Sequence, residues 1–201
     1  MTSITLATIN AKYMHASLGL RYLYANLGRL QRHCRIAEFT INERAVDIVE
    51  RLLADRPRII GLGVYIWNAA ISAEVVGLIK AVRPETVVVL GGPEVSYEQD
   101  HQPIVRAADY VIPGMADLEF ARLCGRILEG SAPAPGVLAT GEFDIRELSL
   151  PYRWYTARDI DERLIYVEAS RGCPFKCEFC LSALDRTAWP FDLDAFLEQM
   201  H

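Results

Sequence analysis

Short apolar runs alternate with stretches of helical periodicity along the first 130 residues of the chain. Runs rich in Val, Ile and Thr favour strands, whereas apolar residues spaced three and four apart favour helices. A strand that is followed by a parallel strand needs a crossover connection, and helices in these crossovers cover both faces of the sheet. The alternation therefore predicts an α/β fold with a doubly wound, parallel, five-stranded sheet of the Rossmann-like (flavodoxin-like) kind. The predicted strands are 4–9, 35–40, 58–67, 86–90 and 109–112, and the predicted helices are 18–30, 45–54, 69–82 and 116–129.

In a sheet of this kind, ligands bind in the crevice outside the carboxyl ends of the strands. Gly91 and Gly92 close a buried strand, where missing side chains let the backbone approach a large flat ligand. A tight turn, which many α/β proteins have after a strand, is the alternative interpretation of this glycine pair. The loops of interest begin at Asn10, Thr40, Tyr65, Gly91 and Pro113.

Composition and charge exclude several classes of protein. The chain has 21 Lys and Arg against 26 Asp and Glu, and this net charge of −5 offers no basic face for nucleic-acid phosphates. Its apolar runs fall short of the roughly 20 residues that cross a bilayer, so no membrane association is predicted. The first residues lack the basic start and apolar run of a secretory signal. The expected compartment is therefore the cytoplasm, where thiols stay reduced.

A change of composition after residue 130 divides the chain. Residues 131–136 read Ser-Ala-Pro-Ala-Pro-Gly, which is too poor in large side chains to pack as a helix or a central strand. A further strand is predicted at 164–169, and the first turns of a helix at 191–200. The predicted organisation is an α/β domain at 1–130, a linker at 131–163 and the start of a second domain at 164–201.

Three of the five cysteines, Cys173, Cys177 and Cys180, fall within eight residues. Their C-x3-C-x2-C spacing can close three thiolates on one metal centre. Structural zinc needs a fourth protein ligand, and His201 is the only histidine further along the chain. A [4Fe-4S] cluster with three cysteine ligands keeps one iron open, and that iron can chelate the amino and carboxylate groups of a small molecule. Zinc completed by a distant residue or a partner, and chance clustering, are the alternatives.

Segment 170–182, which contains these cysteines, resembles the cluster motif of the radical S-adenosylmethionine superfamily. The resemblance implies that the three cysteines bind a [4Fe-4S] cluster, that S-adenosylmethionine binds at the open iron, and that Phe179 lies beside the adenine. It also implies that strand 164–169 is the first strand of a barrel. An electron donor such as flavodoxin or ferredoxin is the expected protein partner.

The first domain resembles the cobalamin-binding domain of cobalamin-dependent radical S-adenosylmethionine proteins, in an uncharacterised subgroup of that class. The likeness rests on the glycine-containing segments 60–63 and 91–94 upstream of the cysteine loop, and on the loops at 10–19 and 64–68. It implies that cobalamin contacts Asn10, Tyr13, His15, Tyr65, Gly91 and Gly92.

His15 departs from the pattern of cobalt-ligating histidines. Cobalamin domains that ligate cobalt through histidine carry D-x-H-x-x-G, whereas here Tyr13 stands two residues before His15 and three residues separate His15 from Gly19. The alternative interpretation of His15 is a loop histidine that hydrogen-bonds the backbone or faces solvent.

Together the resemblances cover nearly the whole chain and imply the N-terminal portion of an enzyme. Such an enzyme cleaves S-adenosylmethionine reductively for radical chemistry, such as methyl transfer to an unactivated carbon. Residues 165–201 amount to about one βα unit, whereas the family's barrel needs roughly six, so turnover by this chain alone is not expected.

Two alternatives are a stand-alone corrinoid- or metal-binding module that works with a partner, and an enzyme of the methylthiotransferase type. The second needs cluster cysteines in its first domain, which offers only Cys34 and Cys124. Both are predicted to be small core residues because their neighbours are apolar.

Overall fold

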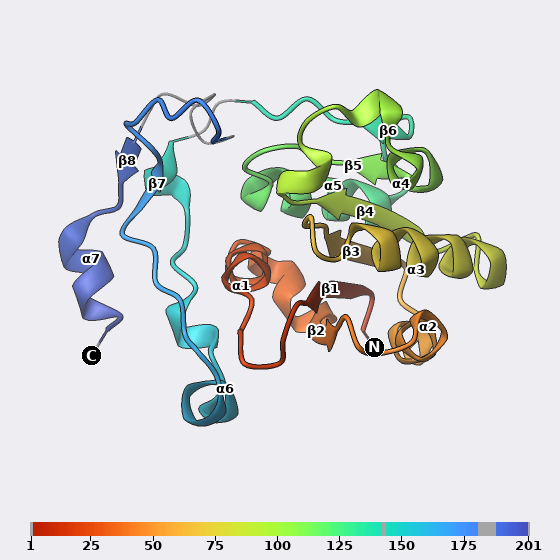
Figure 1. Ribbon diagram of the computed structural model, residues 1–201, viewed down its shortest axis with the longest axis horizontal. Coiled ribbons are helices and arrows are strands. Elements are labelled where there is room, and N and C mark those ends of the chain that lie inside the picture. The colour runs from red at the N-terminus through yellow and green to blue at the C-terminus, as the bar shows by residue number, and fades with distance from the viewer. Residues whose placement is uncertain (1, 142–143, 181–187, 201) are drawn as a thin grey trace.

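A parallel sheet of six strands forms the centre of the protein in the computed structural model, which describes residues 2–141, 144–180 and 188–200 (Figure 1). The strand order is β2-β1-β3-β4-β5-β6, and every neighbouring pair is parallel. The order reverses between β1 and β3, so the carboxyl ends of these two strands flank the crevice in which ligands of such sheets bind. The strands are β1 (Ile4–Asn10), β2 (Cys34–Thr40), β3 (Ile59–Gly63), β4 (Val87–Gly91), β5 (Tyr110–Val111) and β6 (Gly136–Val137).

Helices cover both faces of this sheet. Side chains alternate along each strand, so Ile4 and Leu6 of β1 face one helical layer while Ala7 and Ile9 face the other. The first layer consists of α1 (Leu18–Ala25) and α5 (Asp117–Glu129), and the second of α2 (Ala45–Leu53), α3 (Ala69–Val82) and α4 (Pro103–Ala107). Short 3-10 turns occur at Gly28–His33, Pro93–Val95, Gln99–His101, Ile145–Glu147 and Tyr152–Trp154.

The strands and helices predicted within the first domain all exist; helix 69–82 has the predicted bounds, and the boundaries of the others are shifted. The predicted helix at 18–30 ends early, because Asn26 caps α1 and Gly28 takes a left-handed φ of 54°, which a helix does not continue. The sequence pattern does not predict α4, since five residues are too few to show a helical period. No described helix is long and apolar enough to cross a membrane.

The prediction of five strands is wrong, because β6 adds a sixth strand from within the predicted linker. Gly136 and Val137 pair with Tyr110 and Val111 of β5. An edge strand is hydrogen-bonded on one side only. Two residues are therefore enough to extend the sheet, even in a Pro-rich segment that cannot form a helix or a central strand.

The predicted strand at 164–169 is also wrong. Within that range only Leu164 makes a β-bridge, with His15, and strand β7 (Ser170–Gly172) begins after it. β7 pairs antiparallel with β8 (Ala188–Pro190), so the described residues contain a small two-stranded sheet and no parallel barrel unit. Backbone groups of 164–168 bond the loop after β1 and two tyrosine hydroxyls instead of a neighbouring strand. Tertiary contacts of this kind override strand propensity.

The remaining C-terminal residues pack beside α1 (Figure 1). α6 (Ala157–Glu162) begins with a capping box formed by Thr156 and Asp159. α7 (Leu193–Glu198) confirms the helix predicted at 191–200, and its N-cap Asp192 accepts the amide of Ala195 at 2.8 Å. An apolar cluster joins this part of the chain to α1, and its buried members are Ala16, Tyr22, Ile145, Leu148, Leu150, Tyr152, Tyr155 and Phe191.

Candidate functional site

A cavity of about 300 Å³ opens at the carboxyl ends of β3 and β4, between α1 and α5. Residues two apart on a strand share a face, so Gly61 and Gly63 of β3 both point toward this cavity. Gly63 pairs with Gly91 of β4, and the two strands therefore present bare backbone at the same level. We call this space the glycine cavity. Its walls also include Leu18, Tyr22, Gly92, Asp117, Glu168 and Arg171.

The absent side chains determine the shape of the glycine cavity. A Cβ at Gly61 would lie 2.7 Å from the ring of Phe120, so this glycine lets α5 approach the sheet and close one end. A Cβ at Gly91 would have one neighbour within 4 Å, the carbonyl oxygen of Ile112 at 3.6 Å, so Gly91 borders open space. Gly92 has a φ of 105°, and a Cβ there would collide with the Val64 backbone. The two interpretations of the glycine pair thus apply to different residues. Gly91 leaves open space on the cavity floor, whereas Gly92 forms a tight turn.

A second cavity, of about 340 Å³, lies at the switch point between β1 and β3. Two ring pairs line it. Tyr65 and Trp67 stack with centroids 4.6 Å apart, and His15 and Tyr166 stack with centroids 5.7 Å apart. We call this space the aromatic cavity. It shares three lining residues with the glycine cavity, namely Leu18, Gly19 and Tyr65.

Most of the predicted cobalamin contacts line these cavities, but Tyr13 lines neither of them. The ring of Tyr13 packs against the guanidinium groups of Arg158 and Arg163, 5.7 Å and 5.1 Å from its centroid. Its hydroxyl donates to Glu162 at 3.0 Å, so Tyr13 belongs to the contact with α6. The residues that do line one or both cavities are Asn10, His15, Tyr65, Gly91 and Gly92.

His15 is held by both its ring and its backbone. The Tyr166 hydroxyl lies 2.7 Å from Nδ1, which leaves Nε2 as the ring nitrogen outside this contact. The His15 carbonyl accepts Nδ2 of Asn10 at 3.0 Å and a guanidinium nitrogen of Arg163. The ring contact is thus with a side-chain hydroxyl, and not with the backbone as in the alternative interpretation of His15.

A buried group of two arginines and two carboxylates fastens the loop after β1 to the C-terminal part. It comprises Arg21 of α1, Glu38 of β2, Asp159 of α6 and Arg163, and each side chain is 10% exposed or less. Arg21 donates to both carboxylates at 2.8 Å. Arg163 donates to Glu38 at 2.8 Å and to Asp159 at 3.0 Å. We call this group the ionic network; its charges balance, which lets four ionised side chains stay buried.

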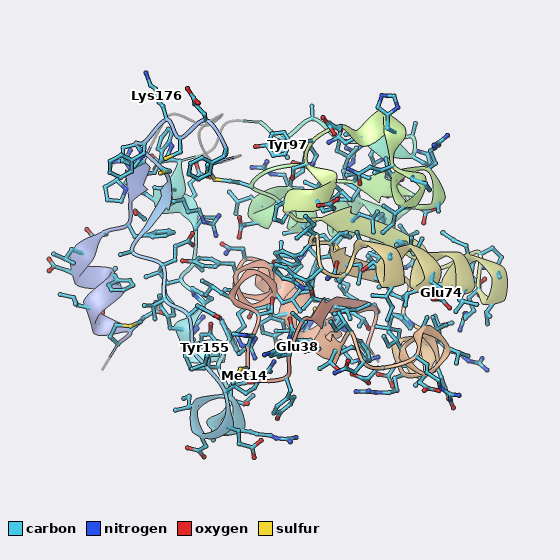
Figure 2. All side chains as sticks on the ribbon, in the orientation of Figure 1. Met14, Glu38, Glu74, Tyr97, Tyr155 and Lys176 are labelled. Atoms are coloured by element: carbon cyan, nitrogen blue, oxygen red, sulfur yellow. The ribbon has the colours of Figure 1, made fainter. Side chains whose placement is uncertain are left out.

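The ionic network lowers the pKa values of both its carboxyl groups. Burial by itself raises the pKa of Glu38, but hydrogen bonds from Arg163 and Arg21 outweigh it and hold the pKa below its ordinary value of 4.5. Burial likewise raises the pKa of Asp159, and hydrogen bonds from Thr156 and Arg21 hold it well below 3.8. Figure 2 shows Glu38 with Met14 and Tyr155 in the region where the loop after β1 meets the C-terminal part.

Acid is expected to destabilise the attachment of the C-terminal part. Because both carboxyl groups have lower pKa values in the folded than in the unfolded protein, the stability they contribute is complete above their ordinary values of 4.5 and 3.8. That stability is lost as the pH falls through these values and below them. Urea unfolding between about pH 7 and about pH 3 should show a declining free energy of unfolding at the acid end, and Glu38→Gln should make the decline shallower. Equal slopes for both proteins would contradict the assignment.

Arg171 links the glycine cavity to the cysteine loop. Its guanidinium donates to the two carboxylate oxygens of Asp117 at 2.6 Å and 3.2 Å, and it lies 4.4 Å from the ring centroid of Tyr22. Asp117 is the first residue of α5, and all three residues line the glycine cavity. Cys173 follows Arg171 by two positions, so the cysteine loop begins beside a cavity wall.

The cysteine loop itself lies at the periphery, where Figure 2 shows Lys176 pointing outward. Cys173 is partly buried, whereas Cys177 and Cys180 are exposed and form a turn in which the Cys180 amide donates to the Cys177 carbonyl at 3.1 Å. Phe179 in this turn is 94% exposed. Within the described ranges, no three His, Cys, Asp or Glu side chains converge closely enough to hold a metal ion. Leu181 and Ser182, at the end of the predicted cluster motif, and His201, the histidine further along the chain, lie outside the described residues.

Sequence reasoning misses the four residues of the ionic network, which join the loop after β1 to the C-terminal part. Arg21 and Asp159 are 138 residues apart, and Arg163 and Glu38 are 125 apart, so no local spacing connects them. One available signal is the position of Arg21, a charged residue among the apolar residues of a predicted amphipathic helix. Charged residues are almost never fully buried unless they are paired. An arginine among the apolar residues of this helix therefore indicates a buried partner but does not identify it.

Comparisons with known proteins bear on the family and the fold. The model of the B12 binding domain family matches residues 4–123, which is more than half of the chain. No curated protein matches. One similar solved structure is the radical S-adenosylmethionine methyltransferase TsrM from Kitasatospora setae, with cobalamin and a [4Fe-4S] cluster bound. Its TM-score is 0.70 and its sequence identity is 15%, and the match covers 100% of this chain and 45% of that chain.

Two further solved structures are similar. The cobalamin-dependent S-adenosylmethionine radical enzyme OxsB has a TM-score of 0.66 and 18% identity over 98% of this chain and 30% of that chain. A cobalamin-binding protein from Desulfitobacterium hafniense DCB-2 has a TM-score of 0.48 and 22% identity over 62% of this chain and 58% of that chain. This chain thus spans between 30% and 58% of the length of these proteins.

At 15% and 18% identity, the likenesses to TsrM and OxsB show a shared fold. The family match is more specific, because residues 4–123 include β1 to β5 and therefore the strand ends that build both cavities. The chain belongs to the B12 binding domain family, and its parallel sheet is the core of a cobalamin-binding domain.

Proposed function

We propose that this chain is the cobalamin-binding portion of a radical S-adenosylmethionine protein, with cobalamin at the glycine and aromatic cavities and a [4Fe-4S] cluster on the cysteine loop. The observation that carries the proposal is the ion pair between Arg171 and Asp117. It joins a wall of the glycine cavity directly to the segment that leads into the cysteines, so the two proposed cofactor sites adjoin in one chain.

The shape of the cavities supports cobalamin as the ligand. A corrinoid is larger than either cavity, so one cavity would enclose only part of it, and the two share a border at Gly19 and Tyr65. The backbone at Gly63 and Gly91 allows close approach of a bulky group, which any larger residue would block. The rings of Tyr65 and Trp67 add an apolar surface of the kind that lines cofactor sites.

The proposed contacts are Asn10, His15, Tyr65, Gly91 and Gly92. His15 is proposed as a contact and not as a ligand of cobalt, because the pattern around it departs from D-x-H-x-x-G.

The donor set of the cysteine loop supports an iron–sulfur cluster. Cys173, Cys177 and Cys180 are proposed to hold [4Fe-4S], with S-adenosylmethionine at the open iron and Phe179 beside its adenine. Thiols on a peripheral loop of eight residues, two of them exposed and one partly buried, can gather around a metal centre without disturbing the sheet. When bound, these groups would supply an electron for reductive cleavage of S-adenosylmethionine and a corrin carrier for a methyl group.

The protein's own residues would position these groups. Arg171 and Asp117 hold the start of the cysteine loop, and the two stacked ring pairs line the aromatic cavity beside the strand ends. The division into 1–130, 131–163 and 164–201, and service of the cluster by a flavodoxin or ferredoxin, stay predictions.

The proposal is tested by anaerobic reconstitution with iron, sulfide and hydroxocobalamin, followed by desalting and an absorption spectrum. Retention of corrinoid bands together with a broad iron–sulfur shoulder is the expected result. Cys177→Ala should remove the shoulder and keep the corrinoid bands, because Cys177 is exposed and lies outside both cavities. Cys124→Ala is the matched control, since the thiol of this α5 residue is buried among apolar side chains and burial raises its pKa.

Other outcomes of the same experiment favour other functions. Corrinoid without iron–sulfur absorption would indicate a corrinoid-binding module that works with a partner. Iron retained through Cys34 or Cys124 would indicate a methylthiotransferase type of protein. The structure opposes that outcome, because burial raises the pKa of Cys34 to about 12 and thus disfavours the thiolate that iron needs.

A further inference from the structure

Residues 164–171 cross both cavities, although they lie outside the segment 4–123 that the family model matches. We call them the strap. The strap begins against the loop after β1, where the Leu164 amide donates to the Met14 carbonyl at 2.7 Å and the Leu164 carbonyl accepts the amide of Ala16 at 3.4 Å. Tyr166 then lines the aromatic cavity, and Glu168 and Arg171 line the glycine cavity.

Two tyrosine hydroxyls fix the backbone of the strap. The Tyr152 hydroxyl donates to the carbonyl of Glu168 and accepts its amide, both at 2.9 Å. The Tyr155 hydroxyl donates to the carbonyl of Tyr166 at 3.1 Å. Both tyrosines belong to the buried cluster on α1, so the strap is attached to the domain along its length.

The side chains of the strap make specific contacts with cavity residues. Arg171 bonds Asp117 through two nitrogens and Glu168 at 3.2 Å, which places one positive charge between two carboxylates. The Tyr166 hydroxyl contacts Nδ1 of His15 at 2.7 Å, and the Tyr166 ring stacks on the His15 ring. These contacts orient three polar groups at the cavity walls, namely Asp117, Glu168 and His15.

We propose that the strap is a wall of the cobalamin site, with Arg171 and Tyr166 as positioning residues that orient Asp117, Glu168 and His15 toward the ligand. This inference rests on the cobalamin site proposed above. It predicts that affinity for cobalamin depends on residues outside the matched domain. Removal of Arg171 would leave the carboxylates of Asp117 and Glu168 without their shared cation, so both side chains would turn away from the cavity wall.

Equilibrium dialysis with cyanocobalamin, and visible circular dichroism of the bound corrinoid, test this inference on the full chain. Arg171→Met is expected to weaken binding about 10-fold, because hydrogen bonds to charged groups no longer hold the wall. Arg171→Lys should fall between Arg171→Met and the unsubstituted chain, since lysine keeps the charge and loses the two-nitrogen geometry. The matched control is Arg153→Met, an arginine that stacks on Trp154 and lines neither cavity.

Tyr166→Phe provides a second test that does not depend on a buried charge. Tyr166 is 47% exposed, so the variant should fold, and loss of its hydroxyl should change the visible circular dichroism of bound cyanocobalamin through a freed His15 ring. A merely structural role would leave that spectrum unchanged at saturation. If Arg171→Met does not fold, Tyr166→Phe alone tests the inference.

The inference is overturned if both variants bind cyanocobalamin with the affinity and circular dichroism of the unsubstituted chain. Failure of the unsubstituted chain to retain cyanocobalamin would be a different result. It would overturn the proposed cobalamin site, and the inference with it.

Discussion

Replacing Gly91 with leucine is expected to lower the affinity for cobalamin about 100-fold while the protein still folds. Gly91 lies on the floor of the glycine cavity, and a Cβ there would make one ordinary contact, 3.6 Å from the carbonyl oxygen of Ile112. The leucine side chain would therefore occupy the cavity and not the packed core. Overpacking of a filled site costs about 1–3 kcal/mol, and the upper end of that range corresponds to about 100-fold in binding.

Cyanocobalamin binding by equilibrium dialysis, together with urea unfolding, measures both parts of this result. The free energy of unfolding should not fall, because an apolar side chain would fill apolar space in the unliganded protein. The matched control is Gly77→Leu in α3, where a Cβ would have no neighbour within 4 Å and which lies away from both cavities. If Gly91→Leu retains full affinity for cobalamin, the ligand does not bind in the glycine cavity.

Replacing Arg21 with methionine is expected to destabilise the protein by about 3–5 kcal/mol, because removal of one partner leaves buried charges uncompensated. The Arg21 side chain is 4% exposed, donates to Glu38 and Asp159 at 2.8 Å, and lies 4.5 Å from the ring centroid of Tyr155. Arg163 alone would then face two carboxylates. The loss should be concentrated at the attachment of the C-terminal part, since Asp159 belongs to α6.

Urea unfolding gives the total change, and limited proteolysis reports whether residues 131–163 become cleavable before the sheet unfolds. Arg29→Met is the matched control, because Arg29 pairs with Glu129 at 3.0 Å on the surface, where the two side chains are 79% and 59% exposed. An exposed ion pair contributes about 0–1 kcal/mol. Equal losses in the two variants would show that the ionic network carries no special stability.

The local pattern of the sequence accounts for the sheet and for part of the site. The apolar run at 86–90 predicts a buried strand, and β4 (Val87–Gly91) is found there, with Gly91 at its carboxyl end on the cavity floor. These predictions succeed because side-chain period and glycine conformation are properties of neighbouring residues. The predictions at 164–169 and at the sheet edge fail because hydrogen-bond partners in the folded chain, and not local propensity, decide whether an extended segment joins a sheet.

The sequence by itself determined the βα alternation, the glycines at the strand ends and the spacing of the three cysteines, since each depends on residues close together in the chain. Only the tertiary structure decided the sixth strand, the position of Tyr13 outside the cavities, the ionic network and the strap. Arg163 and Glu38, or Arg171 and Asp117, meet across 125 and 54 residues. Such pairs form because the folded sheet and helices bring them within hydrogen-bond distance, and burial then makes each charge depend on its partner.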